Sequence, residues 1–201
     1  MTKIISFEGL DKSGKHSALN VIKSYLINKG YSVEELSFPN YKTEVGKLIR
    51  KYLIGELKLD KVAFETLQAT DKLDGQRHIK ELIGKVDYIL IDRYIHSQFA
   101  YGMNNVHPSY LEKLLEPIIS PDIVLYLDVS VENSMNRKGE HGDNDIYESN
   151  KRLLSNVKSN YEFIFNDKFM MFETELHIFD ANKSLDEVTS DLLLNIDTII
   201  R

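Results

Sequence analysis

The residues with the clearest chemical meaning are the nine from Gly9 to Ser17, which read Gly-Leu-Asp-Lys-Ser-Gly-Lys-His-Ser. A glycine, four residues, a second glycine, a lysine and then serine or threonine form the phosphate-binding loop. Glycines let the backbone curl around an anion, and backbone N–H groups at the start of a helix hold it. An apolar run precedes this segment and a helical pattern follows it, as the motif requires. The segment therefore predicts a nucleotide-phosphate site, against the alternative of a glycine turn with a solvated lysine.

His16 departs from this pattern, because it stands where a serine or threonine would supply a hydroxyl to Mg²⁺. Imidazole is a poor ligand for this hard, oxygen-preferring cation. Ser17 is the nearest hydroxyl, but one further residue along a helix turns a side chain about 100° away. The loop motif alone therefore leaves open how Mg²⁺ is held, although this cation keeps several waters in such sites.

Length and composition limit the class of protein. The 201 residues, 42% hydrophobic and 28% charged, predict one globular domain over residues 1–201 with a full core. The net charge of −6 offers no overall basic surface for nucleic acid. The absence of cysteine excludes disulfides and thiolate metal sites and fits a reducing compartment. Apolar runs are shorter than the ~18 residues that cross a membrane, and no signal-peptide pattern is present, so we expect a cytoplasmic protein without membrane partners.

Strand and helix patterns alternate along the chain. Strand-like segments cover residues 3–7, 32–38, 88–91, 122–129 and 176–179, and helical patterns cover 15–28, 43–54, 61–83, 109–118, 130–137, 148–165 and 184–200. This alternation predicts a doubly wound α/β sheet, with ligands at the carboxyl ends of its strands. Charged residues follow three strands directly, at Glu8, at Asp92 with Arg93, and at Asp128. The polar stretch 138–145, with two glycines, is either a lid or a plain surface loop.

Four segments resemble successive motifs of the thymidylate kinase family, in the same order and spacing over nearly the whole chain. They are residues 4–15, 37–53, 91–102 and 120–129. The basic residue inside the loop, Lys12, is closer to the eukaryotic and poxvirus type. The resemblance implies a sheet of about five parallel strands of the P-loop NTPase type, with a lid at about residues 138–147. It also implies transfer of a phosphoryl group from ATP to a deoxynucleoside monophosphate, with Mg²⁺ and commonly in a homodimer.

The resemblance gives roles to charged residues that the loop motif alone leaves open. Lys15 would bridge the donor phosphates, and Asp11 would contact the acceptor sugar hydroxyl and help to arrange the metal site. Lys12 would place positive charge beside the transferring phosphoryl group. Asp92 would hold Mg²⁺ through water, and Arg93 would grip the acceptor phosphate with its planar fork. The predicted catalytic residues are these five, Asp11, Lys12, Lys15, Asp92 and Arg93.

Two sets of binding residues follow from the same resemblance. The ATP-binding set is Gly9, Leu10, Asp11, Lys12, Ser13, Gly14, Lys15, His16, Ser17 and Arg137, with Lys138 beside it. The acceptor set is Phe38, Tyr41, Lys42, Gln68, Lys72, Arg93, Ser97 and Tyr101. A purely structural explanation stays open for several of these residues. It is a solvated lysine at 12, an ion pair at 92 and 93, helix packing at 97 and 101, and a solvated face at 137 and 138.

Three positions of the acceptor site depart from the family pattern. Tyr41 occupies the position of an arginine that binds the acceptor phosphate, with Lys42 beside it. Gln68 replaces a phenylalanine that stacks on thymine, and Lys72 replaces a second phosphate-binding arginine. An amide cannot supply an aromatic face, although it donates and accepts hydrogen bonds to a base edge. A lysine substitutes a point charge for the bidentate fork of arginine.

These departures concern the acceptor and the metal position, whereas the segments that carry the fold match the family. We expect either an acceptor other than plain thymidylate or a weakened enzyme. Gln68 together with Tyr41 favours a pyrimidine deoxynucleotide, with conversion of dTMP to dTDP in nucleotide biosynthesis as the first candidate. Deoxyuridylate or a 5-modified pyrimidine deoxynucleotide is the next candidate.

Two other classes of protein share part of this pattern. A P-loop protein that binds nucleotide with little kinase activity would explain His16, but it would not need the charged residues at 11, 15, 92 and 93 together. A deoxynucleoside kinase shares the loop and an acidic-arginine motif. The segment 38–47 and the overall length disfavour this third alternative.

Overall fold

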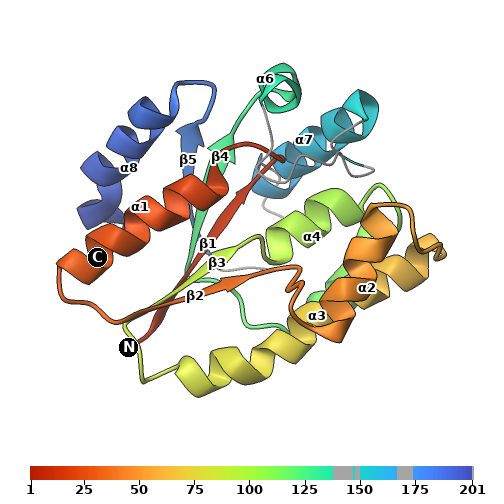
Figure 1. Ribbon diagram of the computed structural model, residues 1–201, viewed down its shortest axis with the longest axis horizontal. Coiled ribbons are helices and arrows are strands. Elements are labelled where there is room, and N and C mark those ends of the chain that lie inside the picture. Colours follow the sequence, from red (N-terminus) through yellow and green to blue (C-terminus); the bar gives the residue numbers. More distant parts are fainter. Residues whose placement is uncertain (138–146, 148–149, 167–173, 201) are drawn as a thin grey trace.

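The computed structural model of the chain describes residues 1–137, 147, 150–166 and 174–200 (Figure 1). Of the lid expected at about residues 138–147, only Tyr147 lies within these ranges. Lys138, which the sequence places beside the donor phosphates, lies outside the described residues.

A five-stranded parallel sheet forms the centre of the molecule, in the order β2-β3-β1-β4-β5. In register, Phe7 of β1 lies opposite Asp92 of β3, and Gly9 of β1 lies opposite Leu127 of β4. The central strands are almost wholly buried, which explains their continuous apolar sequences. The predicted α/β sheet of about five parallel strands is therefore confirmed. The strands are β1 (Lys3–Gly9), β2 (Val33–Ser37), β3 (Tyr88–Asp92), β4 (Ile123–Asp128) and β5 (Glu175–Asp180).

Helices cover both faces of this sheet (Figure 1). Helices α1 and α8 pack against each other on one face, whereas α4 packs against α7 and α5 on the other. Within the described ranges, no helix combines the length and the apolar character that a membrane span requires. The helices are α1 (Lys15–Asn28), α2 (Glu44–Leu53), α3 (Lys61–Leu82), α4 (Ile95–Gly102), α5 (Pro108–Leu115), α6 (Val131–Asn136), α7 (Lys151–Asn166) and α8 (Leu185–Ile199).

Most helix starts are capped by a side chain, but α1 is not. The hydroxyl of Thr43 accepts from the N–H of Gly46 at the start of α2, and the Asp60 carboxylate accepts from the N–H of Val62 at the start of α3. Helix α1 instead follows Gly14, whose φ of 95° is left-handed and which gives no side-chain cap. The first N–H groups of α1 are thereby left for another acceptor, as a phosphate-binding helix requires.

Helix α4 was not among the helical patterns recognised in the sequence. Seven of its eight residues are buried, including the polar side chains of His96, Ser97 and Gln98. A helix that is buried on nearly every side lacks the one-sided apolar stripe by which an amphipathic helix is recognised. Its burial between the sheet, α7 and α3 fixes the orientation of the side chains that it carries toward the site.

The turn between β2 and α2 is fastened to the sheet and to α3. The N–H of Phe38 donates to the carbonyl of Asp92 over 3.0 Å. The N–H of Asn40 donates to the Asp71 carboxylate over 3.0 Å. The peptide bond between Phe38 and Pro39 is cis. These contacts place residues 38–41 at the carboxyl end of β3, beside α3.

A small second core supports the far wall of the site. It contains Ile49, Leu53, Phe64 and Tyr147, which are all buried. The ring of Phe64 stacks on that of Tyr52, with 3.8 Å between the ring centroids. This cluster joins α2 to α3 and holds both helices beside the sheet.

We expect Phe64→Ala to lower the free energy of unfolding by about 3–5 kcal/mol, because it removes a fully buried ring and leaves a cavity. Chemical denaturation followed by circular dichroism measures the change. Arg77→Ala, at an exposed side chain of the same helix, should change it by less than about 0.5 kcal/mol. A loss below about 1 kcal/mol for Phe64→Ala would mean that the cavity collapses and that this cluster is not rigidly packed.

Candidate functional site

The phosphate-binding loop begins where β1 ends, at Gly9. Its φ of 144° is a conformation that side chains rarely adopt, and a Cβ there would lie 2.7 Å from the carbonyl oxygen of Leu127 and 2.8 Å from Ser13 Oγ. Only glycine fits this close approach of the loop to β4. The loop then turns back and enters α1 at Lys15. The predicted order of strand, loop and helix is therefore present.

Lys15 is folded into the loop. Its Nζ donates to the carbonyl of Leu10 over 2.7 Å and to Ser13 Oγ over 3.3 Å. Burial lowers the pKa of Lys15 to about 8, and the nearby charge of Arg93 acts in the same direction. The ammonium group is thus held inside the loop, close to the first turn of α1, whose N–H groups have no side-chain cap. This arrangement suits a phosphate ligand.

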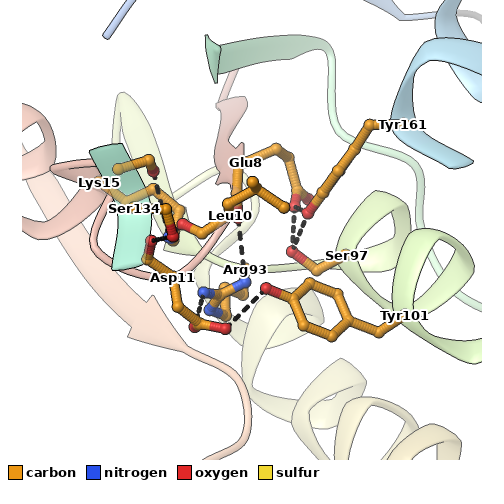
Figure 2. Close-up of polar contacts among 11 residues, drawn as sticks. Glu8, Leu10, Asp11, Lys15, Arg93, Ser97, Tyr101, Ser134 and Tyr161 are labelled. Atoms are coloured by element: carbon orange, nitrogen blue, oxygen red, sulfur yellow. Dashed lines mark hydrogen bonds and ion pairs between the residues drawn. The ribbon is translucent and has the colours of Figure 1, made fainter. Parts of the chain in front are cut away.

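Asp11, Arg93 and Tyr101 point toward one another at the mouth of the loop, as Figure 2 shows. Arg93 forms an ion pair with Asp11 Oδ1 and donates to the carbonyl of Gly9 over 3.2 Å. The Tyr101 hydroxyl donates to Asp11 Oδ2 over 2.9 Å, and its ring lies 5.3 Å from the guanidinium of Arg93. Burial opposes ionisation of Asp11, but the charges of Arg93 and Lys15 outweigh it and hold the pKa of Asp11 below its usual value. The sequence-predicted residues 11, 93 and 101 therefore form one cluster.

Two residues of the site have left-handed backbones although they are not glycine. Lys12 has a φ of 59° and Arg93 a φ of 60°. Such conformations are costly for ordinary side chains and collect at ligand-binding sites, where the surrounding structure enforces them. Both carry positive charge to the same end of the sheet. Their strained backbones favour a functional role for both cations over the alternatives of a solvated lysine at 12 and a structural ion pair at 92 and 93.

A second polar group fixes α4 to β1 (Figure 2). The fully buried Glu8 accepts hydrogen bonds from the hydroxyl of Ser97 and from the N–H of Tyr94. The hydroxyls of Ser97 and Tyr161 lie 2.8 Å apart, so α7 joins the same network. Burial raises the pKa of Glu8, against the hydrogen bonds that favour its charged form. Ser97 thus serves the internal network, although it also lines the pocket described next.

A pocket opens beside this cluster, between the loop and helices α2, α3 and α4. Its volume is about 100 Å³. Seven of the eight predicted acceptor residues line it, whereas Lys42 is exposed and lies outside the lining. The predicted acceptor residues in the lining are Phe38, Tyr41, Gln68, Lys72, Arg93, Ser97 and Tyr101. The others in the lining are Asp11, Pro39, Leu53, Glu65, Gln98 and Tyr147.

Lys72 provides the cation of the pocket that is not part of the loop cluster. Its Nζ lies 5.7 Å from the ring centroid of Phe38, and the side chain is buried. Burial lowers the pKa of Lys72 to about 8, although the carboxylates of Asp71 and Glu65 oppose this shift. A buried lysine whose charge is poorly solvated gains by binding an anion.

Asp92 ends β3 with one oxygen unsatisfied. Its Oδ1 is buried and accepts no hydrogen bond within the part of the chain that the structure describes. Three or more His, Cys, Asp or Glu side chains arranged to hold a metal are not found in the same ranges. A single orphaned carboxylate oxygen fits Mg²⁺, which takes few protein ligands and keeps several waters beside nucleotide phosphates. The predicted metal role of Asp92 is thus compatible with its surroundings.

The remaining predicted donor-site residues lie around the loop. His16 is exposed on the first turn of α1, and Ser17 is partly buried. The guanidinium of Arg137 donates to the carbonyl of Lys12 over 3.2 Å and to that of Ala181 over 2.6 Å. Arg137 thus lies between the loop and the connection from β5 to α8, beside the donor side of the site.

Sequence reasoning missed several residues of the site. Glu8 was singled out only as a charged strand end, and nothing in the sequence indicated that it fastens α4. Glu65 and Gln98 lie in α3 and α4 among ordinary helical residues, so spacing gives no sign of their burial at one pocket. Leu53 and Tyr147 reach the pocket through tertiary packing of the second core.

Comparison with known proteins agrees with this geometry. A family model described as thymidylate kinase matches residues 7–192. A probable thymidylate kinase of Methanococcus aeolicus is 32% identical over 96% of this chain and 95% of its own, and the thymidylate kinase of Plasmodium falciparum is 29% identical over 98% and 90%. The solved structure of the Candida albicans thymidylate kinase has a TM-score of 0.81 at 27% identity and covers 98% of this chain and 92% of that one. The chain therefore belongs to the thymidylate kinase family.

Proposed function

We propose that this protein is a nucleoside monophosphate kinase that transfers the γ-phosphoryl group of ATP to dTMP and yields dTDP. The observation that carries the proposal is the cluster of Asp11, Arg93 and Tyr101, which joins the phosphate-binding loop to the acceptor pocket. The loop would hold the phosphates of ATP on one side of this cluster, and the cations of the pocket would hold the acceptor phosphate on the other. The two reacting groups are thereby brought together. The family membership of the chain supports the same acceptor.

The reaction is a direct transfer between two phosphates. An oxygen of the acceptor phosphate attacks the γ-phosphorus of ATP, and the bond between that phosphorus and the β–γ bridging oxygen breaks, so that ADP leaves. No proton has to move when the acceptor phosphate is fully ionised. Catalysis then rests on alignment and on neutralising negative charge.

The residues at the junction divide this work between donor and acceptor. Lys15 leaves its contacts with Leu10 and Ser13 and binds the donor phosphates as a mobile point charge. Arg93 exchanges part of its pairing with Asp11 for the acceptor phosphate, for which its fork is suited. Asp11, released in part, accepts from the sugar hydroxyl of the acceptor. Lys12 adds positive charge beside the transferring group.

Mg²⁺ accompanies ATP in this proposal and supplies charge neutralisation at the phosphates when bound. Asp92 is the protein group that would hold it, through water, since its Oδ1 is buried and without a partner in the described ranges. His16 supplies no hydroxyl and is exposed. The protein would therefore rely on one carboxylate and on nucleotide oxygens for the metal.

We also propose that the protein acts as a cytoplasmic homodimer of single-domain chains. Apolar side chains are exposed on α2 and α3, with Leu48 at 42%, Val62 at 46% and Leu73 at 39%. Exposed apolar side chains on two helices that pack together support a contact surface.

A coupled assay of ADP formation with ATP, Mg²⁺ and dTMP tests the proposed activity. We expect turnover by the natural chain and a fall in kcat of about 10²–10³-fold for Lys15→Met, because a preorganised cation at the transferring phosphate is lost. Lys23→Met, a change of the same type on the same helix at a partly buried ion pair with Glu35 outside the site, should leave kcat unchanged. ATP binding without turnover of any monophosphate would instead favour a nucleotide-binding protein, and a preference for dUMP or a 5-modified relative would replace dTMP as acceptor.

The pKa of about 8 for Lys15 predicts a pH dependence of ATP affinity. The lysine is charged below this pH and loses its charge above it, so affinity should be full below about pH 7.5 and weaken by up to about tenfold per pH unit above pH 8. Titration calorimetry with ATP from pH 6.5 to 9.5 measures the effect. Lys15→Arg stays charged in this range and should flatten the profile. A flat profile for the natural chain would contradict the role of Lys15.

The Mg²⁺ dependence of the rate tests how the metal is held. We expect Asp92→Asn to raise the half-saturating Mg²⁺ concentration by about tenfold or more, because the charge of the ligand is removed. His16→Thr restores the hydroxyl of the loop motif and should lower that concentration without disturbing the fold. If the rate and metal dependence of His16→Thr match those of the natural chain, His16 is a tolerated replacement and the metal is held entirely elsewhere.

A further inference from the structure

The two ends of the acceptor pocket differ in chemistry. Asp11 and Arg93 lie at the end next to the loop, where the proposed function places the acceptor phosphate and sugar. The other end is formed by α2, α3, α4 and Tyr147, and it is the part left for the base. Polar side chains at that end are Glu65, Gln68 and Gln98.

Gln98 lines this region and carries an unsatisfied acceptor. Its Nε2 donates to the backbone carbonyl of Glu65 over 3.0 Å, and a carbonyl can only accept, so this contact fixes which way the amide faces. The Oε1 atom is buried and has no hydrogen-bond partner within the described ranges. A buried acceptor without a donor is costly, so this oxygen is matched to a ligand that donates.

Glu65 presents a second acceptor beside the first. The side chain is 2% exposed, and its Oε1 accepts from Asn105 Nδ2 over 2.7 Å. No donor reaches Oε2 in the part of the chain that the structure describes. This oxygen faces α4 at Gly102, where a Cβ would lie only 2.8 Å away. Because Gln98 and Gly102 are one turn apart, both acceptors lie against the same face of α4.

Thymine does not match two acceptors, because the edge of its ring carries one donor, the N3–H group. A 4-amino pyrimidine offers two N–H donors on its amine. A 5-hydroxymethyluracil offers N3–H and the hydroxyl. Both bases share a second donor on the edge that faces away from the sugar, and this second donor is what the pair of acceptors requires.

We propose that Glu65 and Gln98 read the base edge, and that the protein also accepts pyrimidine deoxynucleoside monophosphates whose base carries a second hydrogen-bond donor, in a 4-amino or a 5-hydroxymethyl group. This proposal rests on the proposed kinase function and names a further class of acceptor for its pocket. Gln98 accepts from the first donor, and the carboxylate of Glu65 accepts from the second. Gln68, which lines the same pocket and whose amide both donates and accepts, completes the edge.

The protonation of Glu65 adds a dependence on pH. Burial raises the pKa of Glu65 to about 7, against the hydrogen bond from Asn105 and the charge of Lys72 on the same helix. The charge of Glu65 also raises the pKa of Tyr52 of α2, on which burial has the larger effect. Below this pKa the carboxyl is neutral and donates to the O4 atom of thymine. Above it the carboxylate only accepts, which favours the base with the second donor.

Initial rates with dTMP, dUMP, dCMP and 5-hydroxymethyl-dUMP between pH 6 and 8 test the proposal. The ratio of kcat/KM for dCMP or 5-hydroxymethyl-dUMP to that for dTMP should rise by about tenfold as Glu65 ionises. A rise for one of the two identifies whether the second donor sits at position 4 or 5. A constant ratio, with both of them poorer than dTMP at every pH, would overturn the proposal.

Glu65→Gln supplies the matched variant. Its amide keeps an acceptor for Asn105 and turns the other group into a permanent donor, so it should favour dTMP and abolish the dependence of the ratio on pH. Glu81→Gln is the same change on the same helix at an exposed side chain and should behave as the natural chain. Equal ratios for Glu65→Gln and the natural chain would overturn the role of Glu65. The pH series of the natural chain decides the proposal even if Glu65→Gln does not fold.

Equilibrium binding separates this inference from the proposed function. Titration calorimetry of each monophosphate without ATP ranks the bases whether or not phosphate is transferred. Absence of turnover with every monophosphate would refute the kinase, but a tighter binding of dCMP or 5-hydroxymethyl-dUMP than of dTMP at pH 8 would still support the edge-reading pair. Binding of dTMP as tight as or tighter than both at that pH would overturn it.

Discussion

The ion pair between Arg93 and Asp11 links the acceptor pocket to the phosphate-binding loop. Arg93 follows β3 directly, and Asp11 lies in the loop after β1. Both groups are largely withdrawn from water, and removing charges from water is repaid only by close pairing and by further hydrogen bonds. Tyr101 and the carbonyl of Gly9 supply those bonds. The loop, β3 and α4 are therefore held in one arrangement before any nucleotide binds, and incoming phosphates compete for charges that are already in place.

The requirement that a buried charged group be hydrogen-bonded also applies to Glu8, at the centre of the sheet. A carboxyl group with no exposure to water must find its hydrogen bonds within the protein. Ser97 of α4 and the N–H of Tyr94 donate them. Glu8 thereby fixes the rotation of α4, which carries Gln98 and Tyr101 toward the pocket. A hydrophobic side chain in place of Glu8 would leave the hydroxyl of Ser97 and the N–H of Tyr94 without this acceptor, so the network adds to the packing that orients α4.

Much of the fold was predictable because parallel strands and amphipathic helices leave periodic patterns in the sequence. All five strands and seven of the eight helices of the described ranges follow such patterns, and α1 begins at the predicted residue, Lys15. Helix α4 was not among the periodic patterns, since burial on nearly every side removes its periodicity. Residues of the site that follow a motif, such as Asp11 and Arg93, were also predictable. Glu65 and Gln98 were not, because only the packing of α3 against α4 brings them together.

Gln68, which departs from the family pattern, and Glu65 and Gln98, which sequence reasoning missed, line the same pocket, and together they change how a base is recognised. An aromatic ring attracts the face of every base to a similar degree and so contributes affinity with little selectivity. Gln68 removes that face, and Glu65 and Gln98 place acceptors at the edge, of which Gln98 Oε1 is buried without a partner in the described ranges. A buried polar group penalises a base that lacks the matching donor far more than a missing methyl group does in an apolar pocket. The exchange of stacking for edge contacts therefore trades general affinity for discrimination among pyrimidines.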